Sequence, residues 1–489
     1  MPISRRDLAR STLGLIGGGL LAGCTPDQAS LDPHSRPVPT APRPSPSPGQ
    51  NVVTTTLTPR LATVDLGGPT ARTWCYGGTV PGKMLRATAG DFLSIRVENQ
   101  LPTDTSVHWH GIRLRNAADG VPGVTQSPIA GGTSHLYEFT APDPGTYFFH
   151  PHTGVQLDRG LYAPLIIDDT EEPGAYDAEW IIVLDDWTDG IGDNPDDILA
   201  GFKAQGGTVS PGMNHDMGGM GGMGGSPLGD AGDIAYPHYL INGRIPAAPA
   251  TFTGKPGQRI RVRIINAAAD TVFALALDQH TLRITHTDGF PVQPVDTGAL
   301  YLAMGERYDA VITLGEGVFP LVAVPVGKAG LGRALVRTAS GATPAQTVRP
   351  EALDGEPLLG TSLRPTEAAR LPERSPDAIA DVTLNGQMRP YAWGINGRMY
   401  GHDTPLAVAP GQRLRMRMTN MTMMVHPMHI HGHTWALPGS GGLRKDTVLV
   451  LPMQTVEADL HADNPGAWAF HCHNAYHAET GMMTTLTYA

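Results

Sequence analysis

The sequence has few cysteines, few charged side chains and no long apolar run outside its N-terminal region. Its 489 residues include three cysteines, Cys24, Cys75 and Cys472, which is too few for a disulfide framework. Charged residues make up 17% of the chain and the formal net charge is −11, which indicates no surface for nucleic acid. These features exclude a disulfide-rich domain, a nucleic-acid-binding protein and a helical protein with several membrane spans.

The first 24 residues have the pattern of an export signal. Arg5 and Arg6 precede a short apolar stretch that ends in "LAGC" at Cys24. The twin arginine resembles the signal for export of folded proteins. "LAGC" resembles a lipobox, in which the cysteine is lipidated and becomes the mature N-terminus; a fortuitous small-residue cleavage site is the alternative. Residues 25–50 are rich in Pro and Ser and predict an extended tether. We therefore expect an exported protein, in the periplasm or cell envelope, anchored by lipid to the outer face of the cytoplasmic membrane.

The rest of the chain has the pattern of an all-β protein. Gly and Pro are abundant, and short runs of Val, Ile, Leu and Thr recur between turn signals. One pattern occurs three times, each time after a Pro-containing segment: "GDFLSIRVENQ" from Gly90, "GQRIRVRIINA" from Gly257 and "GQRLRMRMTNM" from Gly411. Each copy is a glycine turn, an alternating strand and an Asn. Three copies at similar spacing predict three consecutive Greek-key β-sandwiches.

Changes in composition place the domain boundaries. We expect the first domain at 51–172, the second at 176–345 and the third at 378–489, after a charged, Pro-containing connection. Residues 206–233, within the second domain, are rich in Met and Gly and have no hydrophobic periodicity, which predicts a mobile loop. Nothing in the sequence indicates an oligomer, so we expect a monomer.

The segment "HCHNAYHAETGMM" places Cys472 between two histidines. In a β-strand, residues i and i+2 point to the same face and residue i+1 points to the other. His471 and His473 would then face one way and Cys472 the other. A strand of this kind can contact two metal centres.

Three more His-x-His pairs stand elsewhere in the chain. They are His108/His110, His150/His152 and His429/His431. Two of the four pairs fall in the first domain and two in the third, so the eight imidazoles predict a multinuclear metal site where these domains meet. One solution is a site of three ions, in which two ions bind three imidazoles each and the third binds two. Imidazole alone does not choose among copper, zinc, iron and nickel.

The other side of the same segment predicts a second centre. Cys472 points away from the histidine cluster, and His426, His477 and Met482 are candidates to join it. One Cys with two His and a weak axial Met is the ligand set of blue-copper electron-transfer sites. The second centre therefore favours copper.

Together these motifs resemble those of the three-domain multicopper oxidases, the group of laccases and bacterial cuprous oxidases. H-x-H-G, H-x-H, H-P-x-H-x-H-G and H-C-H-x-x-x-H-x-x-x-x-M are all complete, and the resemblance extends from about residue 51 to the end. It implies three cupredoxin-like domains and four copper ions: one type 1, one type 2 and a type 3 pair. It also implies an enzyme that couples one-electron oxidation of a donor to four-electron reduction of O2 to water.

The resemblance also assigns the ligands. It places His426, Cys472 and His477 on the type 1 copper, with Met482 axial, and His108 and His429 on the type 2 copper. It places six residues on the type 3 pair: His110, His150, His152, His431, His471 and His473. Three further histidines have no ligand role in this pattern: His280, His286 and His433.

Proton donors are expected near the copper cluster. Asp119, in "NAADGVPG", stands where members of the family carry an acid beside that cluster, and a turn-forming Asp before Gly is the alternative. Some members have a second acid directly after the second type 1 histidine. That position is Ala478 here, followed by Glu479, so a second relay through this segment is in doubt.

The electron donor is the open question. An axial Met favours easily oxidised donors such as Cu(I), Fe(II) or electron-rich phenols. The loop carries soft thioethers, which select Cu(I), although the alternative is a low-complexity loop without a role. Its candidate ligands are Met213, His215, Asp216, Met217, Met220 and Met223. In the well-known cuprous oxidases the Met-rich insert lies in the third domain, near the type 1 site, whereas here it lies in the second.

We therefore expect a Cu(I) oxidase that acts in copper tolerance. A laccase-like phenol oxidase or a ferroxidase is the alternative, and a non-catalytic copper-binding protein on the same fold is a remote one.

Overall fold

The computed structural model describes residues 43–172, 174–209 and 228–489. The predicted export signal, the lipobox at Cys24, most of the tether and the Met-rich part of the loop lie outside these residues. Among the described residues, no helix has both the length and the apolar character that a membrane span requires.

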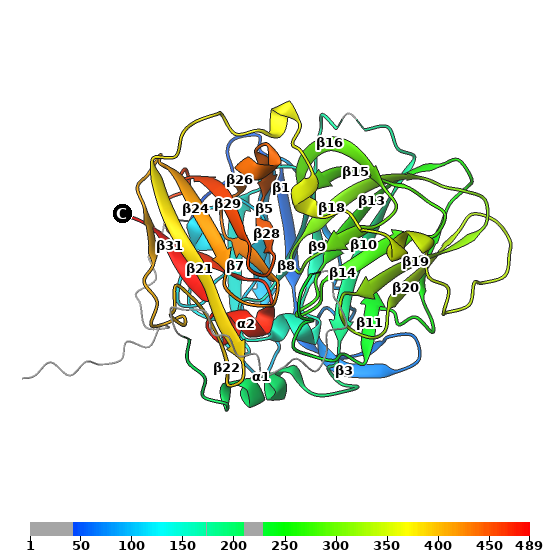
Figure 1. Cartoon of the computed structure of the whole chain (residues 1–489), viewed down its shortest axis with the longest axis horizontal. Coiled ribbons are helices and arrows are strands. Elements are labelled where there is room, and N and C mark those ends of the chain that lie inside the picture. Colours follow the sequence, from blue (N-terminus) through cyan, green and yellow to red (C-terminus); the bar gives the residue numbers. More distant parts are fainter. Residues whose placement is uncertain (1–42, 173, 210–227) are drawn as a thin grey trace, which may run out of the picture.

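The described chain is built almost entirely from β-strands, which confirms the predicted fold class (Figure 1). Two α-helices accompany the strands, α1 (Pro195–Lys203) and α2 (Ala475–Glu479). Asn194 and Asn474 cap their N-termini, because each Asn side chain accepts backbone N–H groups that have no partner within the helix.

The first unit has a three-stranded sheet, a four-stranded sheet and a hairpin, in the orders β1-β5-β7, β4-β9-β8-β6 and β2-β3. Its strands are β1 (Val52–Leu57), β2 (Pro59–Asp65), β3 (Thr70–Tyr76), β4 (Leu85–Thr88), β5 (Phe92–Glu98), β6 (His108–His110), β7 (Ser134–Thr140), β8 (Gly145–His150) and β9 (Ala163–Asp168).

The second unit has a six-stranded and a five-stranded sheet, in the orders β11-β10-β13-β18-β15-β16 and β12-β20-β19-β14-β17. Its strands are β10 (Ala178–Trp187), β11 (His238–Ile241), β12 (Ala250–Thr253), β13 (Arg259–Asn266), β14 (Phe273–Leu277), β15 (Leu282–Thr287), β16 (Phe290–Thr297), β17 (Leu300–Leu302), β18 (Arg307–Thr313), β19 (Val318–Pro325) and β20 (Gly332–Arg337).

The third unit repeats this arrangement strand for strand, in the orders β22-β21-β24-β29-β26-β27 and β23-β31-β30-β25-β28. Its strands are β21 (Ala378–Met388), β22 (Tyr391–Ile395), β23 (Leu406–Val408), β24 (Arg413–Asn420), β25 (His426–Ile430), β26 (Trp435–Leu437), β27 (Leu443–Lys445), β28 (Thr447–Val450), β29 (Thr455–His461), β30 (Ala467–Cys472) and β31 (Met483–Tyr488).

The repeated sequence pattern forms equivalent strands in the three units. The copies are β5, β13 and β24, and each lies parallel to the first long strand of its unit, β1, β10 or β21. Apolar side chains alternate inward along β24, where Leu414, Met416 and Met418 are buried. The internal repeat predicted from the sequence is therefore present in the structure.

The Asn that ends each copy has the same structural role. Asn99, Asn266 and Asn420 are buried, and each Nδ2 donates to two backbone carbonyls while each Oδ1 accepts the N–H two residues later. The side chain thus satisfies polar backbone groups that the sandwich buries. This explains why the pattern ends in Asn rather than in an apolar residue.

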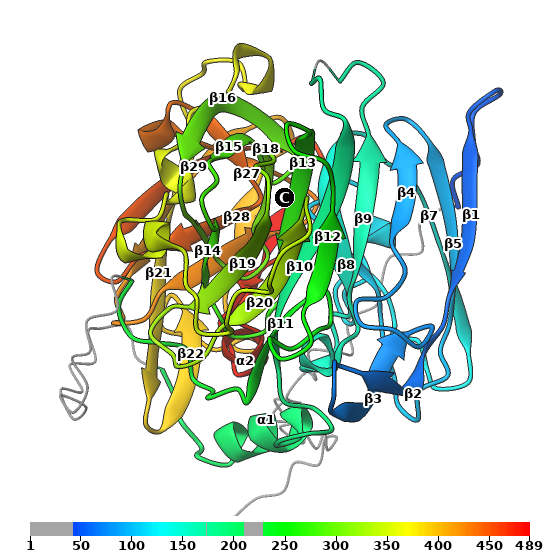
Figure 2. The ribbon, with the colours of Figure 1, turned by 90° about the vertical axis from the view of Figure 1, so that its right-hand side faces the viewer.

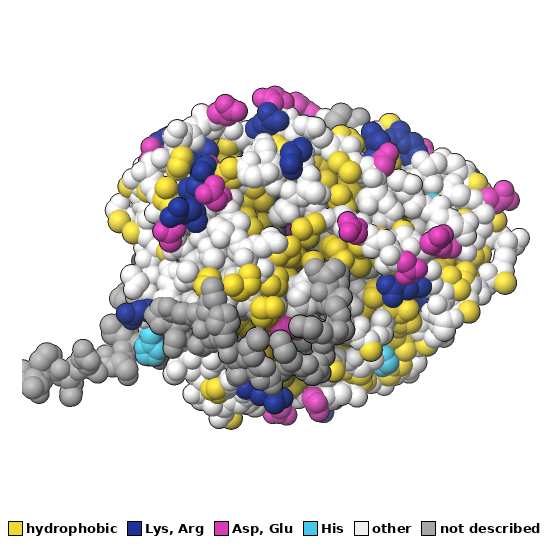
Figure 3. All heavy atoms as spheres, viewed as in Figure 1, with side chains coloured by type: hydrophobic (Ala, Val, Ile, Leu, Met, Phe, Trp, Pro, Cys, Tyr) yellow, Lys and Arg dark blue, Asp and Glu magenta, His cyan; other side chains and the backbone are white. Residues whose placement is uncertain are grey.

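The three units pack against one another. In Figure 1 the second and third units lie side by side, and Figure 2 shows the first unit beside the second. Buried charges join the second unit to the third: Lys445 Nζ lies 3.0 Å from Glu306 and 3.1 Å from Asp288. On the face in Figure 3, apolar side chains gather over the middle and charged side chains of both signs surround them.

Replacement of the repeated Asn in the second unit should destabilise the protein without touching a predicted metal ligand. Asn266→Ala leaves the carbonyls of Thr271 and Leu302 buried without their donor, which should cost about 2–4 kcal/mol. We expect the melting temperature of the metal-free protein to fall by roughly 5–15 °C in calorimetry. Ala at the exposed Asn51 is the control, and an equal effect of both changes would contradict this role.

Candidate metal centres

Two strand pairs bring the His-x-His motifs together. β6 and β8 pair His108 with His150 in the first unit, and β25 and β30 pair His429 with His471 in the third. β6 and β8 take the same places in their sheet as β25 and β30 do in theirs. In the second unit the equivalent strands β14 and β19 carry apolar residues at the corresponding positions, which explains why that unit lacks the motif.

The eight imidazoles of these motifs form one cluster between the first and third units. The His471 Nε2 atom lies 3.0 Å from His431 Nε2 and 3.3 Å from His152 Nε2. The rings of His108 and His431 stack at 3.7 Å, as do those of His110 and His429 at 3.8 Å. His150 and His473 complete the cluster, with ring centroids 5.2 Å apart. The convergence predicted from the sequence is therefore present.

Several imidazole nitrogens in the cluster are buried and have no hydrogen-bond partner. These atoms are Nε2 of His108, His150 and His429, Nδ1 of His110, and both nitrogens of His473. Backbone carbonyls meet the Nδ1 atoms of His108, His150, His429 and His471, which leaves each Nε2 to face the cluster. Buried polar atoms rarely remain without a partner, so their arrangement fits bound metal ions.

The protonation states agree with metal binding. Burial, followed by the charge that the neighbouring imidazoles would carry, lowers the pKa of most of these histidines well below its usual value. For His471 the same causes lower the pKa to about 3. These six rings are therefore neutral at physiological pH, and neutral imidazole is the form that binds metal ions.

A second cluster lies on the opposite side of β30. The Cys472 Sγ atom is 3.7 Å from the Nδ1 atoms of both His426 and His477, and these two nitrogens are 3.2 Å apart. Metal–ligand bonds of roughly 2.0–2.3 Å place the ligands of one ion at about these separations. Met482 is buried beside them, and its carbonyl accepts the Cys472 N–H. Cys472 thus faces away from the eight imidazoles, as the strand alternation predicts.

The outer faces of this second cluster are covered by protein. The Nε2 atom of His426 lies 2.8 Å from Thr422 Oγ1, and the Nε2 atom of His477 lies 3.0 Å from an Asp233 carboxylate oxygen. Trp393 stacks on the His477 ring at 3.9 Å. These contacts fix the ring orientations so that both Nδ1 atoms point toward Cys472.

Burial raises the pKa of the Cys472 thiol above its usual value. Without a nearby cation the thiol would remain protonated at neutral pH. Metal ions bind the thiolate, and a bound cation stabilises that charge in an otherwise apolar position.

Asp119 lies against the eight-imidazole cluster rather than in an exposed turn. Its side chain is fully buried, with one carboxylate oxygen 2.9 Å from His431 Nδ1 and the other 3.3 Å from His108 Nδ1. Asp119 therefore orients an imidazole from each of two units, His431 through its carboxylate and His108 through its backbone carbonyl. A role in proton transfer remains a prediction.

Two acidic residues beside the clusters have no signal in the sequence. Asp446 lies 3.3 Å from His110 Nε2 and 3.5 Å from His429 Nδ1, and Arg307 of the second unit holds it through two charge-assisted hydrogen bonds. Asp233 contacts His477 from across the interface between units. Neither residue belongs to a recurring motif. Packing of the units brings Asp233 to His477, and brings His110 and Arg307 to Asp446, which already lies beside His429 in its own unit.

Four other sequence features fall outside the clusters. His280 accepts the Gly315 N–H and stabilises a turn, and His433 bonds Tyr488, which agrees with structural roles. Cys75 is buried in an apolar group of residues. Glu479 lies on α2 with its carboxylate 3.8 Å from Lys203 Nζ, so it gives no support to a second proton relay.

Comparisons with known proteins agree with this geometry. Three sequence profiles described as multicopper oxidase match residues 60–172, 178–341 and 373–489. The chain is 48% identical to the multicopper oxidase MmcO of Mycobacterium tuberculosis, over 97% of this chain and 95% of the relative.

More distant relatives extend the similarity. The copper resistance protein A of Escherichia coli is 27% identical over 86% of this chain and 90% of its own length. The crystal structure of the laccase from Botrytis aclada superposes with a TM-score of 0.70 at 25% identity, over 90% of this chain and 88% of the laccase. The architecture is thus that of three cupredoxin-like domains.

The geometry around Cys472 predicts the colour of the copper-loaded protein. Thiolate-to-Cu(II) charge transfer should make it blue, and Cys472→Ser should abolish both the colour and oxidase turnover. The fold should persist, because Ser is close to Cys in size and its side-chain oxygen can accept the hydrogen bond that the Asn474 backbone donates to the sulfur. Visible absorption and circular dichroism measure the two properties, and a blue Cys472→Ser protein would refute the role of this cysteine.

Proposed function

The chain belongs to the multicopper oxidase family, and on that basis we propose that this oxidoreductase oxidises Cu(I) in copper tolerance. Bound copper ions supply the one-electron chemistry that couples donor oxidation to the reduction of O2 to water. His426, Cys472 and His477 would hold the type 1 copper, and Met482, buried beside them, would be a further, weaker ligand. His108 and His429 would hold the type 2 copper, and the type 3 pair would take His110, His150, His152, His431, His471 and His473.

The protein positions these sites through its own residues. Cys472 is joined by peptide bonds to His471 and His473, so one strand connects the donor side with the oxygen side. Asp119, buried against two imidazoles, is the group best placed to hold and transfer protons there. The complete ligand set argues against a non-catalytic copper-binding protein.

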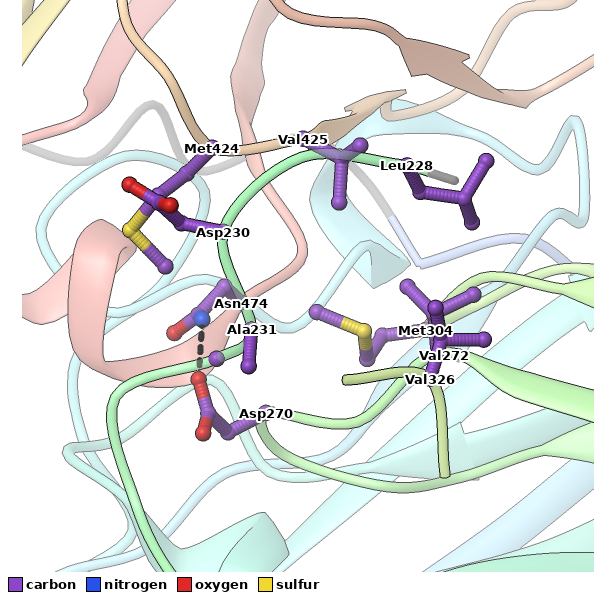
Figure 4. Close-up of a pocket in the computed structure, with 11 residues that line it drawn as sticks. Leu228, Asp230, Ala231, Asp270, Val272, Met304, Val326, Met424, Val425 and Asn474 are labelled. Carbon is purple, nitrogen blue, oxygen red and sulfur yellow. Dashed lines mark hydrogen bonds between the residues drawn. The ribbon is translucent and has the colours of Figure 1, made fainter. Parts of the chain in front are cut away.

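The observation that supports Cu(I) as the donor is a small cavity beside the type 1 cluster. It has a volume of about 20 Å³ and is lined by Leu228, by residues 230–232 and by side chains of the second and third units. Met304 lines it from the second unit and Met424 from the third, and Asp230 and Asp270 also line it (Figure 4). Thioethers are soft ligands that select Cu(I) over Fe(II) or Zn(II).

The size of the cavity separates the candidate donors. A space of this volume holds about one water molecule or one ion, but not an aromatic ring. His426 and His477 are fully buried, and their outer nitrogens already meet Thr422 and Asp233. In the described part of the chain, a bulky phenol therefore has no route to direct contact with either imidazole. An ion in the cavity would contact Met424, which precedes His426 by two residues in the chain.

The Met-rich segment begins and ends near this site. Before it, Gln205 Oε1 accepts the Tyr391 N–H of the third unit; after it, Asp230 pairs with Met424. The methionines at 213, 217, 220 and 223 lie outside the described residues, but both flanks contact the third unit. The described flanks of the segment thus lie against the third unit at the type 1 side, which supports a role of the segment in gathering Cu(I).

Copper tolerance is supported by the relative that is named a copper resistance protein. The direct test of the proposed donor is oxygen consumption with Cu(I), Fe(II) and a phenol, measured side by side. The proposal predicts the highest kcat/KM for Cu(I). A clear preference for the phenol would identify a laccase-like enzyme instead, and a preference for Fe(II) a ferroxidase.

Loss of the thioethers that line the cavity should impair the oxidation of Cu(I) more than the oxidation of other donors. The double change Met304→Leu with Met424→Leu keeps side-chain volume but removes both soft ligands. We expect KM for Cu(I) to rise about ten- to hundredfold, since the loss is one of binding, of about 1–3 kcal/mol. Phenol oxidation should change much less.

Two further variants sharpen this comparison. Met388→Leu, at an exposed methionine of β21, is the control and should leave KM for Cu(I) unchanged. Replacement of the four methionines between 213 and 223 by Ser tests the segment separately and should raise the same KM. Unchanged Cu(I) kinetics in both the cavity and the segment variants would remove the support for a Cu(I) oxidase.

We also propose that the protein is exported and works at the outer face of the cytoplasmic membrane. The twin arginine and the lipobox support this location, and a site that converts Cu(I) to the less permeable Cu(II) would protect the cell there. Lipidation requires the Cys24 thiol, so Cys24→Ala should move the mature protein from the membrane fraction to the soluble fraction. Fractionation and immunoblotting measure this, and wild-type protein found only in the soluble fraction would contradict the anchor.

A further inference from the structure

Asp270 is a buried carboxylate of the second unit that belongs to neither predicted ligand set. Its side chain is fully buried between β13 and β14. One carboxylate oxygen accepts the Asp233 N–H at 3.1 Å and the Asn474 side-chain amide; the other accepts the Ile234 N–H at 2.9 Å and Lys328 Nζ at 2.7 Å. Four donors from three separate parts of the chain thus converge on one carboxylate, and Figure 4 shows its bond to Asn474.

The first connection leads to the outer side of the type 1 site. By binding the N–H groups of Asp233 and Ile234, Asp270 fixes the backbone from which the Asp233 side chain reaches the His477 Nε2 atom. Gly232 permits this close approach, since a Cβ at that position would lie 2.3 Å from the Asp270 carbonyl oxygen. The carboxylate on His477 therefore depends on the attachment of residues 232–234 to Asp270.

The second connection leads from Asp270 to the backbone of His477. Asn474 donates its amide to Asp270, and its Oδ1 accepts the N–H groups of Tyr476 and His477. Helix α2 has five residues, too few to be stable alone, so this cap and the Ala475 N–H bond to the Ala269 carbonyl hold it in place. Asp270 thus orients the cap of the helix that carries His477.

We propose that Asp270 is a positioning residue that fixes His477 from both ends and thereby sets the reduction potential of the type 1 copper. This inference rests on the type 1 assignment in the proposed function. It gives the second unit, which has no His-x-His motif, a direct role in the electron-transfer site.

The expected direction follows from electrostatics. A carboxylate hydrogen-bonded to a ligand imidazole makes the imidazole a better donor and favours the more positive Cu(II) form. When Asp233 and His477 lose their fixed positions, Cu(II) loses part of that stabilisation relative to Cu(I). The potential should therefore rise.

Asp270→Asn tests the proposal in the copper-loaded protein. We expect the ratio of the Cu(I) to the Cu(II) form at a fixed potential to increase about tenfold, which corresponds to a rise of about 59 mV. The redox titration of the blue absorption band measures it, and the electron paramagnetic resonance spectrum of the type 1 copper should change with it. The pair Asp270→Asn with Lys328→Met removes the unpaired lysine charge, and the shift should persist.

Two matched variants separate positioning from general stability. Asp309→Asn also neutralises a buried carboxylate of the second unit, one paired with Arg261 and Arg263 on the side of the first unit. It should lower the melting temperature and leave the type 1 potential unchanged. Gly232→Ala displaces residues 232–234 but keeps Asp270, and should reproduce the shift even if Asp270→Asn fails to fold.

The result that overturns the proposal is a type 1 potential and spectrum equal to wild type in Gly232→Ala and in the Asp270 variants that fold. A shift of the same size in Asp309→Asn would overturn it as well. No electron donor enters these measurements. If the protein proves to prefer phenols over Cu(I), the proposed donor is refuted, but the expected shift in the type 1 potential is unaffected.

Discussion

Both metal clusters depend on the alternation of side chains along one strand, β30. His471, and His473 directly after the last residue of the strand, face the other six imidazoles between the first and third units, while Cys472 faces His426 and His477. The alternation is a property of the extended backbone and needs no further contact to establish it. The pairing of His429 with His471 then fixes the register, because a slip by one residue would exchange the two sides.

The second unit carries none of the predicted ligands of the two clusters, but its charged residues hold both clusters. Arg307 binds Asp446 beside His110 and His429, and Asp270 supports Asp233 beside His477. These groups are buried, and a buried charge is tolerated only when it is paired and hydrogen-bonded. The interface between the second and third units is therefore specific in geometry, and it can position ligands that the second unit does not supply.

The parts of the site that could be predicted from the sequence are those encoded locally. The ligand motifs lie within a few residues of each other, the repeat gives the fold class, and Asp119 stands at a fixed distance after His110. Asp233, Asp270 and Asp446 have no such signal, since the contacts of Asp233 with His477, of Asp270 with Asn474 and of Asp446 with His110 and Arg307 form only after the units have packed together. Likewise, the position of residues 206–233 within the second domain does not reveal that both flanks of the Met-rich segment contact the third.

The central claim is that two clusters, joined by one strand, bind different numbers of copper ions: one ion beside Cys472 and three ions among the eight imidazoles. The most direct measurement is anomalous diffraction at the copper edge from crystals of the copper-loaded protein. The account predicts four peaks: one enclosed by His426, Cys472 and His477, and three among the eight imidazoles of the His-x-His motifs. The absence of a peak beside Cys472, or a single ion among the eight imidazoles, would contradict it.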